Sequence, residues 1–110
     1  MNEPILLLFG MARRASKLSI GFEASTRSVS GGKSLAVFMA SDLSDRSKRK
    51  LTEFSDLKGI FSAELPFTIE ELSNAIGIKA GCISIEDNGF SKKAQLLYTQ
   101  LNGEEITHDD

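Results

Sequence analysis

Cysteine, histidine and long apolar runs are scarce in this 110-residue sequence. Cys82 is the only cysteine, so no internal disulfide can form, and together with the single His108 it provides too few ligands for a structural zinc site. The longest apolar runs, residues 4–9 and 35–40, are too short to cross a bilayer, and the first lacks the basic flank and cleavage site of a signal peptide. We therefore expect a cytoplasmic protein that binds no metal and does not contact a membrane.

Side chains suited to catalysis are also sparse. His108 lies in a polar tail, Cys82 lies inside a predicted strand, and the acidic pair at 70–71 fits a helix cap. Glu86 and Asp87 end a predicted strand, where they suit either a metal or acid/base site or, as the favoured interpretation, the cap of the next helix. We expect a protein that is not an enzyme and has no cofactor.

Charge is distributed unevenly along the chain. The net charge is −2, yet residues 1–50 carry nine Lys/Arg against four Asp/Glu, whereas residues 51–110 carry four against eleven. Four of these acids lie in residues 104–110, which we expect to form a disordered tail after a single domain of residues 1–103. The domain keeps a basic surface that suits a polyanion, although a merely solvated surface explains the same charges.

Apolar spacing and capping residues predict alternating helices and strands. A capping box at Thr68 and Glu71 opens a helix over residues 68–76. Residues 35–40 are bounded by polar residues and predict a central strand that is covered on both faces. The other predicted elements are helices near 3–15, 21–31, 44–58 and 87–101, short strands before Gly21 and at 60–61, and an alternating strand at 82–86. This order indicates an α/β layered sandwich around a small sheet.

Glycines bound the second predicted helix. Gly21 lies where a short strand enters this helix, and such a helix start can bind a phosphate. The segment at 31–34, Gly-Gly-Lys-Ser, looks like the end of a P-loop, but Arg27 stands where that motif requires glycine, and the segment ends a helix instead of opening one. We interpret it as a helix stop from which Lys33 reaches a phosphate.

Two further groups of cations have two interpretations each. Either group is a solvated helix face, which is the commoner case, or a non-specific phosphate contact. The groups are Arg46, Lys48, Arg49 and Lys50 in the third predicted helix, and Lys92 and Lys93 in the last.

Five short sequence segments, together with this order of elements, carry a family resemblance that spans residues 4–101. The segments are residues 5–18, 21–32, 35–42, 70–77 and 87–93. Together they resemble the ribosomal L7Ae superfamily, whose members bind kink-turn RNA, and within it the small bacterial YlxQ-like branch. The resemblance implies a three-layer α-β-α sandwich with a small mixed sheet of about four strands.

The resemblance also implies where RNA would bind. Kink-turn binders of the superfamily begin the second helix with Gly-Thr-Asn-Glu-x-x-Lys, and here Gly21 and the cation Arg27 match this signature. Phe22, Glu23 and Ala24 depart from it. The ionised carboxylate of Glu23 cannot replace the asparagine at a base edge, and the methyl group of Ala24 can read nothing. The second implied contact is the loop before the last strand. It contains Ile78, Lys79 and Ala80, which are either a stacking and phosphate contact or a plain connector.

Our leading hypothesis is a small RNA-binding protein that acts around the ribosome. In this hypothesis four cations neutralise phosphates, and two apolar side chains contact a base. The cations are Lys17, Arg27, Lys33 and Lys79, and the apolar residues are Ile78 and Ala80. We expect structured RNA, such as ribosomal RNA, and ribosomal or translation proteins as partners, and a monomeric state.

The alternative hypothesis is a protein-interaction module on the same scaffold. It requires Phe22 to be an exposed apolar anchor beside Glu23. If Phe22 instead packs inward, it belongs to the core and this hypothesis loses its discriminating feature.

Overall fold

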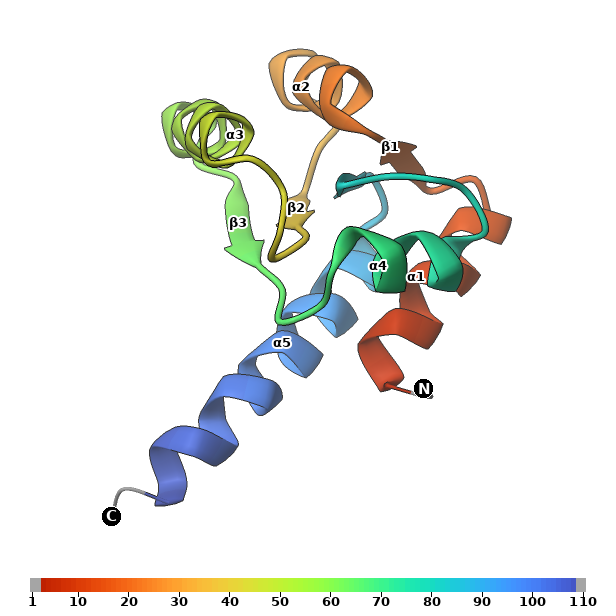
Figure 1. Ribbon diagram of the computed structural model, residues 1–110. Coiled ribbons are helices and arrows are strands. Elements are labelled where there is room, and N and C mark those ends of the chain that lie inside the picture. The colour runs from red at the N-terminus through yellow and green to blue at the C-terminus, as the bar shows by residue number, and fades with distance from the viewer. Residues whose placement is uncertain (1–2, 109–110) are drawn as a thin grey trace.

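The computed structural model describes the backbone of residues 3–108 and the side chains of residues 3–101 (Figure 1). Helices and strands alternate in the order that the sequence predicts. The helices are α1 (Pro4–Arg14), α2 (Phe22–Ser30), α3 (Asp45–Lys58), α4 (Ile69–Ile76) and α5 (Asn88–His108). The strands are β1 (Leu18–Ile20), β2 (Ala36–Met39), β3 (Phe61–Glu64) and β4 (Cys82–Ile85).

The strands form one mixed sheet in the order β1-β4-β2-β3. β2 is parallel to β3, whereas β4 lies antiparallel between β1 and β2. Ile83 of β4 lies opposite both Ile20 of β1 and Phe38 of β2, which defines the register. The prediction that residues 35–40 form a central strand is confirmed.

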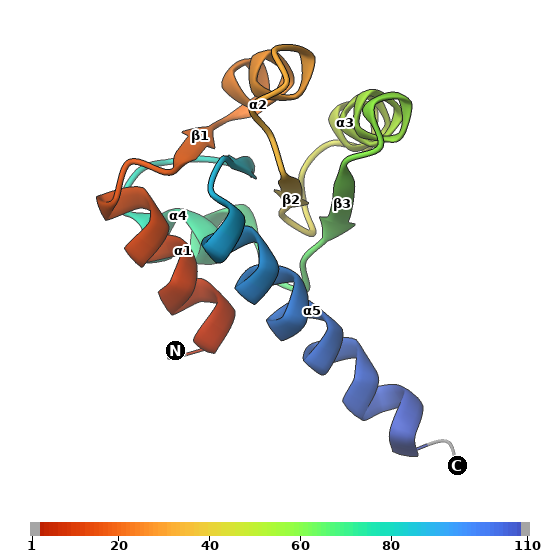
Figure 2. The ribbon, with the colours of Figure 1, turned by 180° about the vertical axis from the view of Figure 1, so that it is seen from behind.

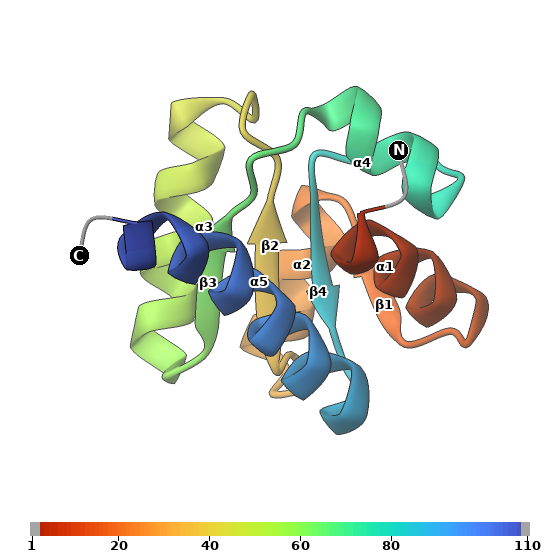
Figure 3. The same cartoon turned by 90° about the horizontal axis from the view of Figure 1, so that it is seen from below.

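Helices cover both faces of this sheet. α2 and α3 lie over one face, and α1, α4 and α5 lie over the other (Figures 1, 2 and 3). A larger core that includes Phe9, Phe38 and Ile83 lies beneath α1, α4 and α5. A smaller core that includes Val37 and Leu51 lies beneath α2 and α3. The predicted three-layer α-β-α sandwich is therefore confirmed.

Capping residues set the ends of the helices, as the sequence predicts. The Ser44 hydroxyl accepts a hydrogen bond from the Ser47 N–H at 3.2 Å and opens α3. Thr68 and Glu71 form the predicted capping box at the start of α4. Gly77 ends α4 at φ +80°, a left-handed conformation that glycine adopts without steric cost.

Strand β4 differs from the predicted alternation, because all four of its residues are buried. Ile83 and Ile85 belong to the larger core, and Cys82 belongs to the smaller core. A strand between two helical layers has no face in contact with water. The residues at 82–85 therefore alternate between two interiors, and no side of the strand is solvated.

Buried serines join α2 to the sheet. The Ser84 hydroxyl lies 2.8 Å from the Ser28 hydroxyl and donates a hydrogen bond to the Ser34 Oγ at 2.7 Å. The buried residues of α2 are Ser25, Ser28 and Val29, and Ser28 gives the helix a hydrogen-bonded contact with β4. Buried polar groups are stable when they bind one another in this way.

Helix α5 is the longest element and extends from the body of the molecule (Figure 2). Asp87 caps it, since its Oδ2 accepts a hydrogen bond from the Phe90 N–H at 2.9 Å. The helix runs on to His108, past the predicted domain end at residue 103, because Gly103 weakens a helix by only about 1 kcal/mol and does not block it. Of the predicted tail, only residues 109–110 lie outside the described residues. None of the described helices combines the length and apolar character that a bilayer-spanning segment needs.

Candidate nucleic-acid interface

The start of α2 is held at one end of the sheet by a glycine. Gly21 has φ +96° and ψ 169°, a conformation that is almost restricted to glycine. Its N–H donates a hydrogen bond to the Cys82 carbonyl at 2.9 Å, and its own carbonyl accepts one from the Ser25 N–H. Gly21 offers no side chain to cap α2, so the positive end of the helix dipole is left for a ligand.

The loop at 77–81 lies beside this helix start. The same bond to Cys82 places Gly21 next to the end of the loop, and the Ala40 N–H donates to the Gly81 carbonyl on the other side. Ile78 is 44% exposed, and Lys79 is exposed as well. The structure therefore brings the start of α2 and two of the predicted loop residues to the same end of the sheet.

Ala80 is not available for the predicted base contact. Its side chain is only 5% exposed and belongs to the larger core. The loop is held against α4 at this point, because the Ala80 N–H donates to the Ser73 Oγ at 3.0 Å. In this loop, Ile78 is the apolar side chain that a base can reach.

Lys17 and Lys33 lie at the opposite end of the sheet. The Lys17 carbonyl accepts a hydrogen bond from the Glu86 N–H, just beyond the end of β4. Lys33 stands two residues before Leu35, whose N–H donates to the Ile85 carbonyl. Ile85 is three residue steps from Cys82 along β4, or about 10 Å. Both lysines are exposed, but the structure does not join them to the start of α2 as the sequence-based hypothesis requires.

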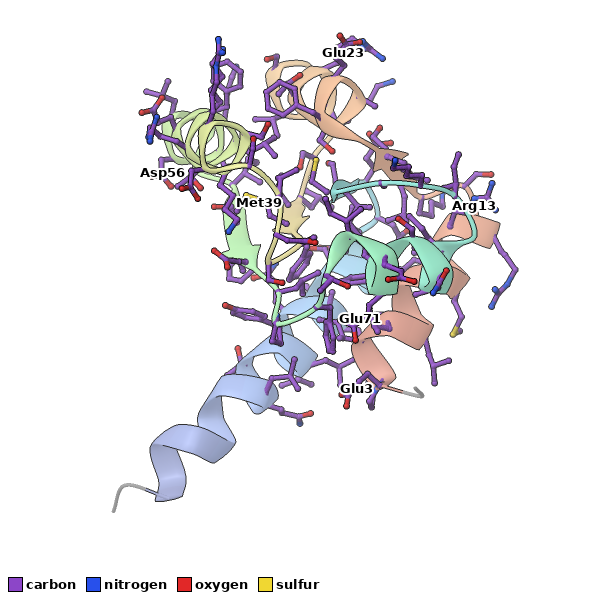
Figure 4. The ribbon with its side chains drawn as sticks, viewed as in Figure 1. Glu3, Arg13, Glu23, Met39, Asp56 and Glu71 are labelled. Carbon is purple, nitrogen blue, oxygen red and sulfur yellow. The ribbon has the colours of Figure 1, made fainter. Side chains whose placement is uncertain are left out.

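The outer surface of α2 carries Arg27 and Glu23, which are both exposed. Figure 4 shows Glu23 on the side of α2 that faces away from the sheet. The two residues are four apart, yet no oxygen of Glu23 lies within 4 Å of the Arg27 guanidinium. Arg27 is thus available to a phosphate, while Glu23 repels one nearby.

Phe22 packs inward. It is partly buried against the smaller core, which includes Val29, Leu51 and Cys82. The exposed anchor that the protein-interaction hypothesis requires is therefore not present at this position.

Two carboxylates lie on one side of Lys79 in the loop at 77–81. A cavity of about 470 Å³ is lined by Lys79 together with Asp42 and Glu70, and the Asp42 Oδ1 accepts a hydrogen bond from the Ile69 N–H at 2.7 Å. Lys79 therefore has to bind a polyanion on the side that faces away from this cavity. Over the described residues, no three His, Cys, Asp or Glu side chains gather as metal ligands would.

Arg13 is a cation that the sequence analysis did not assign to the site. Its Nη1 lies 3.5 Å from the position that a Cβ on Gly77 would occupy, at the start of the loop. Figure 4 shows Arg13 at the end of α1 beside this loop. The sequence pattern showed only a cation in the last turn of a helix, and the contact between α1 and α4 is what brings it to the loop.

This architecture is shared by solved structures. A Bacillus halodurans protein described as having unknown function superposes with a TM-score of 0.83 at 30% identity, over 87% of this chain and 97% of that one. A Giardia lamblia 15.5 kD RNA-binding protein superposes with a TM-score of 0.72 at 17% identity, over 94% and 92%. The fold is therefore that of the L7Ae-like α-β-α sandwich.

A sequence relative identifies the family within this fold class. The Enterococcus faecium RNA-binding protein YlxQ is 36% identical over 90 residues, which cover 82% of this chain and 86% of that protein. No family model matches the chain. The chain therefore belongs to the same family as YlxQ, and its fold is L7Ae-like.

Proposed function

We propose that this protein binds RNA at the end of the sheet where α2 begins. The observation that carries the proposal is the hydrogen bond from the Gly21 N–H to the Cys82 carbonyl, because it holds the helix start beside the loop at 77–81. The name of the Enterococcus relative supports RNA as the ligand. At this end phosphates bind Arg13, Lys79 and the N-terminus of α2, and the RNA continues along the outer surface of α2 to Arg27 in the last turn of that helix.

In this proposal a single side chain of the loop contacts an RNA base. Ile78 is the exposed apolar side chain of the loop, and an unstacked base packs against it. Phe22 is turned inward and Glu23 accepts hydrogen bonds only, so the first turn of α2 discriminates poorly between base pairs. We propose that the protein resembles a kink-turn binder in its position on RNA but has a degenerate recognition signature.

A salt titration tests the proposal. Affinity is measured for a kink-turn RNA and for an unstructured RNA of equal length while the salt concentration is raised. Three phosphate contacts to a duplex predict a log–log slope of about −2.7, from about −0.9 for each contact. A flat response, or no binding at low salt, would overturn RNA binding. Equal affinity for both RNAs would retain RNA binding and overturn kink-turn selectivity.

Substitutions locate the surface. The double variant Arg27→Ala with Lys79→Ala is expected to weaken kink-turn binding at least tenfold, because it removes two charge-assisted contacts. The matched control is Lys92→Ala with Lys93→Ala, which removes the same charge from α5 on the other face of the sheet. Equal losses in both variants would mean that only the net charge matters.

We further propose that the RNA is structured and ribosomal, and that the protein acts as a monomer in the cytoplasm beside ribosomal or translation proteins. Sedimentation of tagged protein through a sucrose gradient, with and without ribonuclease, tests the association. Recovery with ribosomal particles that ribonuclease abolishes would support it, and recovery only at the top of the gradient would contradict it.

A further inference from the structure

The outer surface of α3 exposes apolar side chains that the core does not use. Phe54 is 41% exposed and Leu57 is 82% exposed, whereas Leu51 and Ser55 of the same helix are fully buried against the sheet. The exposed part of the Phe54 ring is therefore open to a ligand.

Three exposed cations share this surface. Residues four apart are neighbours on a helix, so Lys50 and Lys58 flank Phe54 by one turn on each side, and Arg46 precedes Lys50 by one further turn. We call Arg46, Lys50, Phe54, Leu57 and Lys58 the α3 stripe.

The acidic residues of α3 lie away from the centre of the stripe. At 100° for each residue, Asp56 is about 160° around the helix from Phe54. Figure 4 shows Asp56 on the side of α3 that faces away from α2. Glu53 lies about 100° from Phe54 but borders the stripe, since it is four residues before Leu57 and three after Lys50.

The cations of the stripe are not neutralised by the scaffold. Among residues 3–101, the one ion pair joins Lys48 to Glu64 at 3.2 Å, and Lys48 also donates to the Ser41 carbonyl at 2.7 Å. Lys48 therefore holds α3 on the sheet, whereas Lys50 and Lys58 form no ion pair within 4 Å in this part of the chain.

We infer that the α3 stripe is a second RNA-binding surface, on which a base of a single-stranded segment stacks on Phe54 while Lys50 and Lys58 bind the flanking phosphates. An exposed aromatic ring between cations is the combination that binds single strands without reading their sequence, because every base has a face that stacks. The surface is distinct from the start of α2, and its binding does not require a kink-turn.

The absence of tryptophan allows a direct test of stacking. In Phe54→Trp, the single indole reports on the stripe, and its fluorescence is expected to be quenched when a twelve-nucleotide oligouridine is added to the full chain. The control is Leu96→Trp, because Leu96 is 50% exposed but lies on α5, on the opposite face of the sheet. Equal quenching in both proteins, or none in either, would overturn the inference.

Affinity measurements complete the test. Phe54→Ala is expected to weaken oligouridine binding about tenfold, as loss of one stacked base does, while Phe54→Tyr retains binding. Lys50→Ala is expected to weaken it, whereas Arg49→Ala, which removes the same charge about 140° from Phe54, leaves it nearly unchanged. Wild-type affinity in Phe54→Ala would contradict the inference. Circular dichroism verifies that each variant is folded.

The two proposals, RNA binding at the start of α2 and at the α3 stripe, can be refuted separately. If only the α3 stripe binds RNA, oligouridine binds and the Arg27 and Lys79 variants change nothing. If only the start of α2 binds RNA, the kink-turn RNA binds and Phe54→Trp is not quenched by oligouridine.

Discussion

Cys82 lies beneath α2 and is fully buried. Burial raises the pKa of its thiol, because a thiolate is poorly solvated there, and a hydrogen bond to Ser25 opposes this shift to a smaller degree. The group is therefore held as a neutral thiol and acts as a small apolar side chain in the smaller core.

The raised pKa predicts how stability depends on pH. An unfolded thiol has a pKa near about 8.5, so above this pH the unfolded chain loses a proton that the native protein retains, and the free energy of unfolding falls as pH rises. The variant Cys82→Ala lacks this titration. Urea unfolding between pH 7 and 10 is expected to show that the wild type loses stability relative to the variant above about pH 8.5. If the free energy of unfolding of the wild type minus that of Cys82→Ala stayed constant or increased with pH, the raised pKa of Cys82 would be contradicted.

Exposure of single loop residues could not be predicted from the sequence. Ile78 and Ala80 belong to the same short loop, yet Ile78 is 44% exposed and Ala80 is 5% exposed. A loop has no periodicity that would separate them, and the difference depends on the hydrogen bonds between Ala80 and Ser73 of α4. Such contacts form only when the chain has folded.

At the scale of helices and strands, local sequence signals were sufficient to predict the helix boundaries. The boundaries of α3 and α4 follow from Ser44, Thr68 and the glycines at 59 and 77, because caps act on groups within one turn. Burial of β4 on both faces was not predicted, because the strand sequence does not show how many layers cover it.

Removal of a cap has a measurable cost. Thr68→Ala is expected to lower the free energy of unfolding by about 1 kcal/mol, because the Glu71 N–H loses its acceptor. Thr99→Ala is the matched control, since this exposed hydroxyl only donates to the Gln95 carbonyl of its own helix and its removal changes stability by less than about 0.5 kcal/mol. Chemical denaturation measures both values, and equal losses would contradict the capping role.

At the scale of the whole molecule, the strand pairing of the sheet determines which cations lie at the same end of the protein. The sequence shows that the first half of the chain is basic, but the antiparallel pairing of β4 with β1 and β2 sends Lys17 and Lys33 to one end and the start of α2 to the other. The pairing of β4 joins residues more than 40 positions apart, so the division could not be predicted from local spacing.

This division makes a quantitative prediction. Lys17→Ala with Lys33→Ala is expected to leave the salt dependence of kink-turn binding unchanged, whereas Arg27→Ala with Lys79→Ala makes the slope shallower by about 1.8, or about 0.9 for each contact. Both variants lose the same net charge, so long-range attraction is matched. Equal changes in slope would show that RNA contacts both ends of the molecule.

The three hydroxyls of Ser28, Ser34 and Ser84 satisfy one another inside the protein. Ser84 bonds to both of the others, so its change to alanine or valine leaves Ser28 and Ser34 without this partner, which is costlier than the loss of one bond. We therefore expect these positions to vary as a set among relatives, either all polar or all apolar. A lineage that exchanges only one of them would have to admit a water molecule between α2 and the sheet.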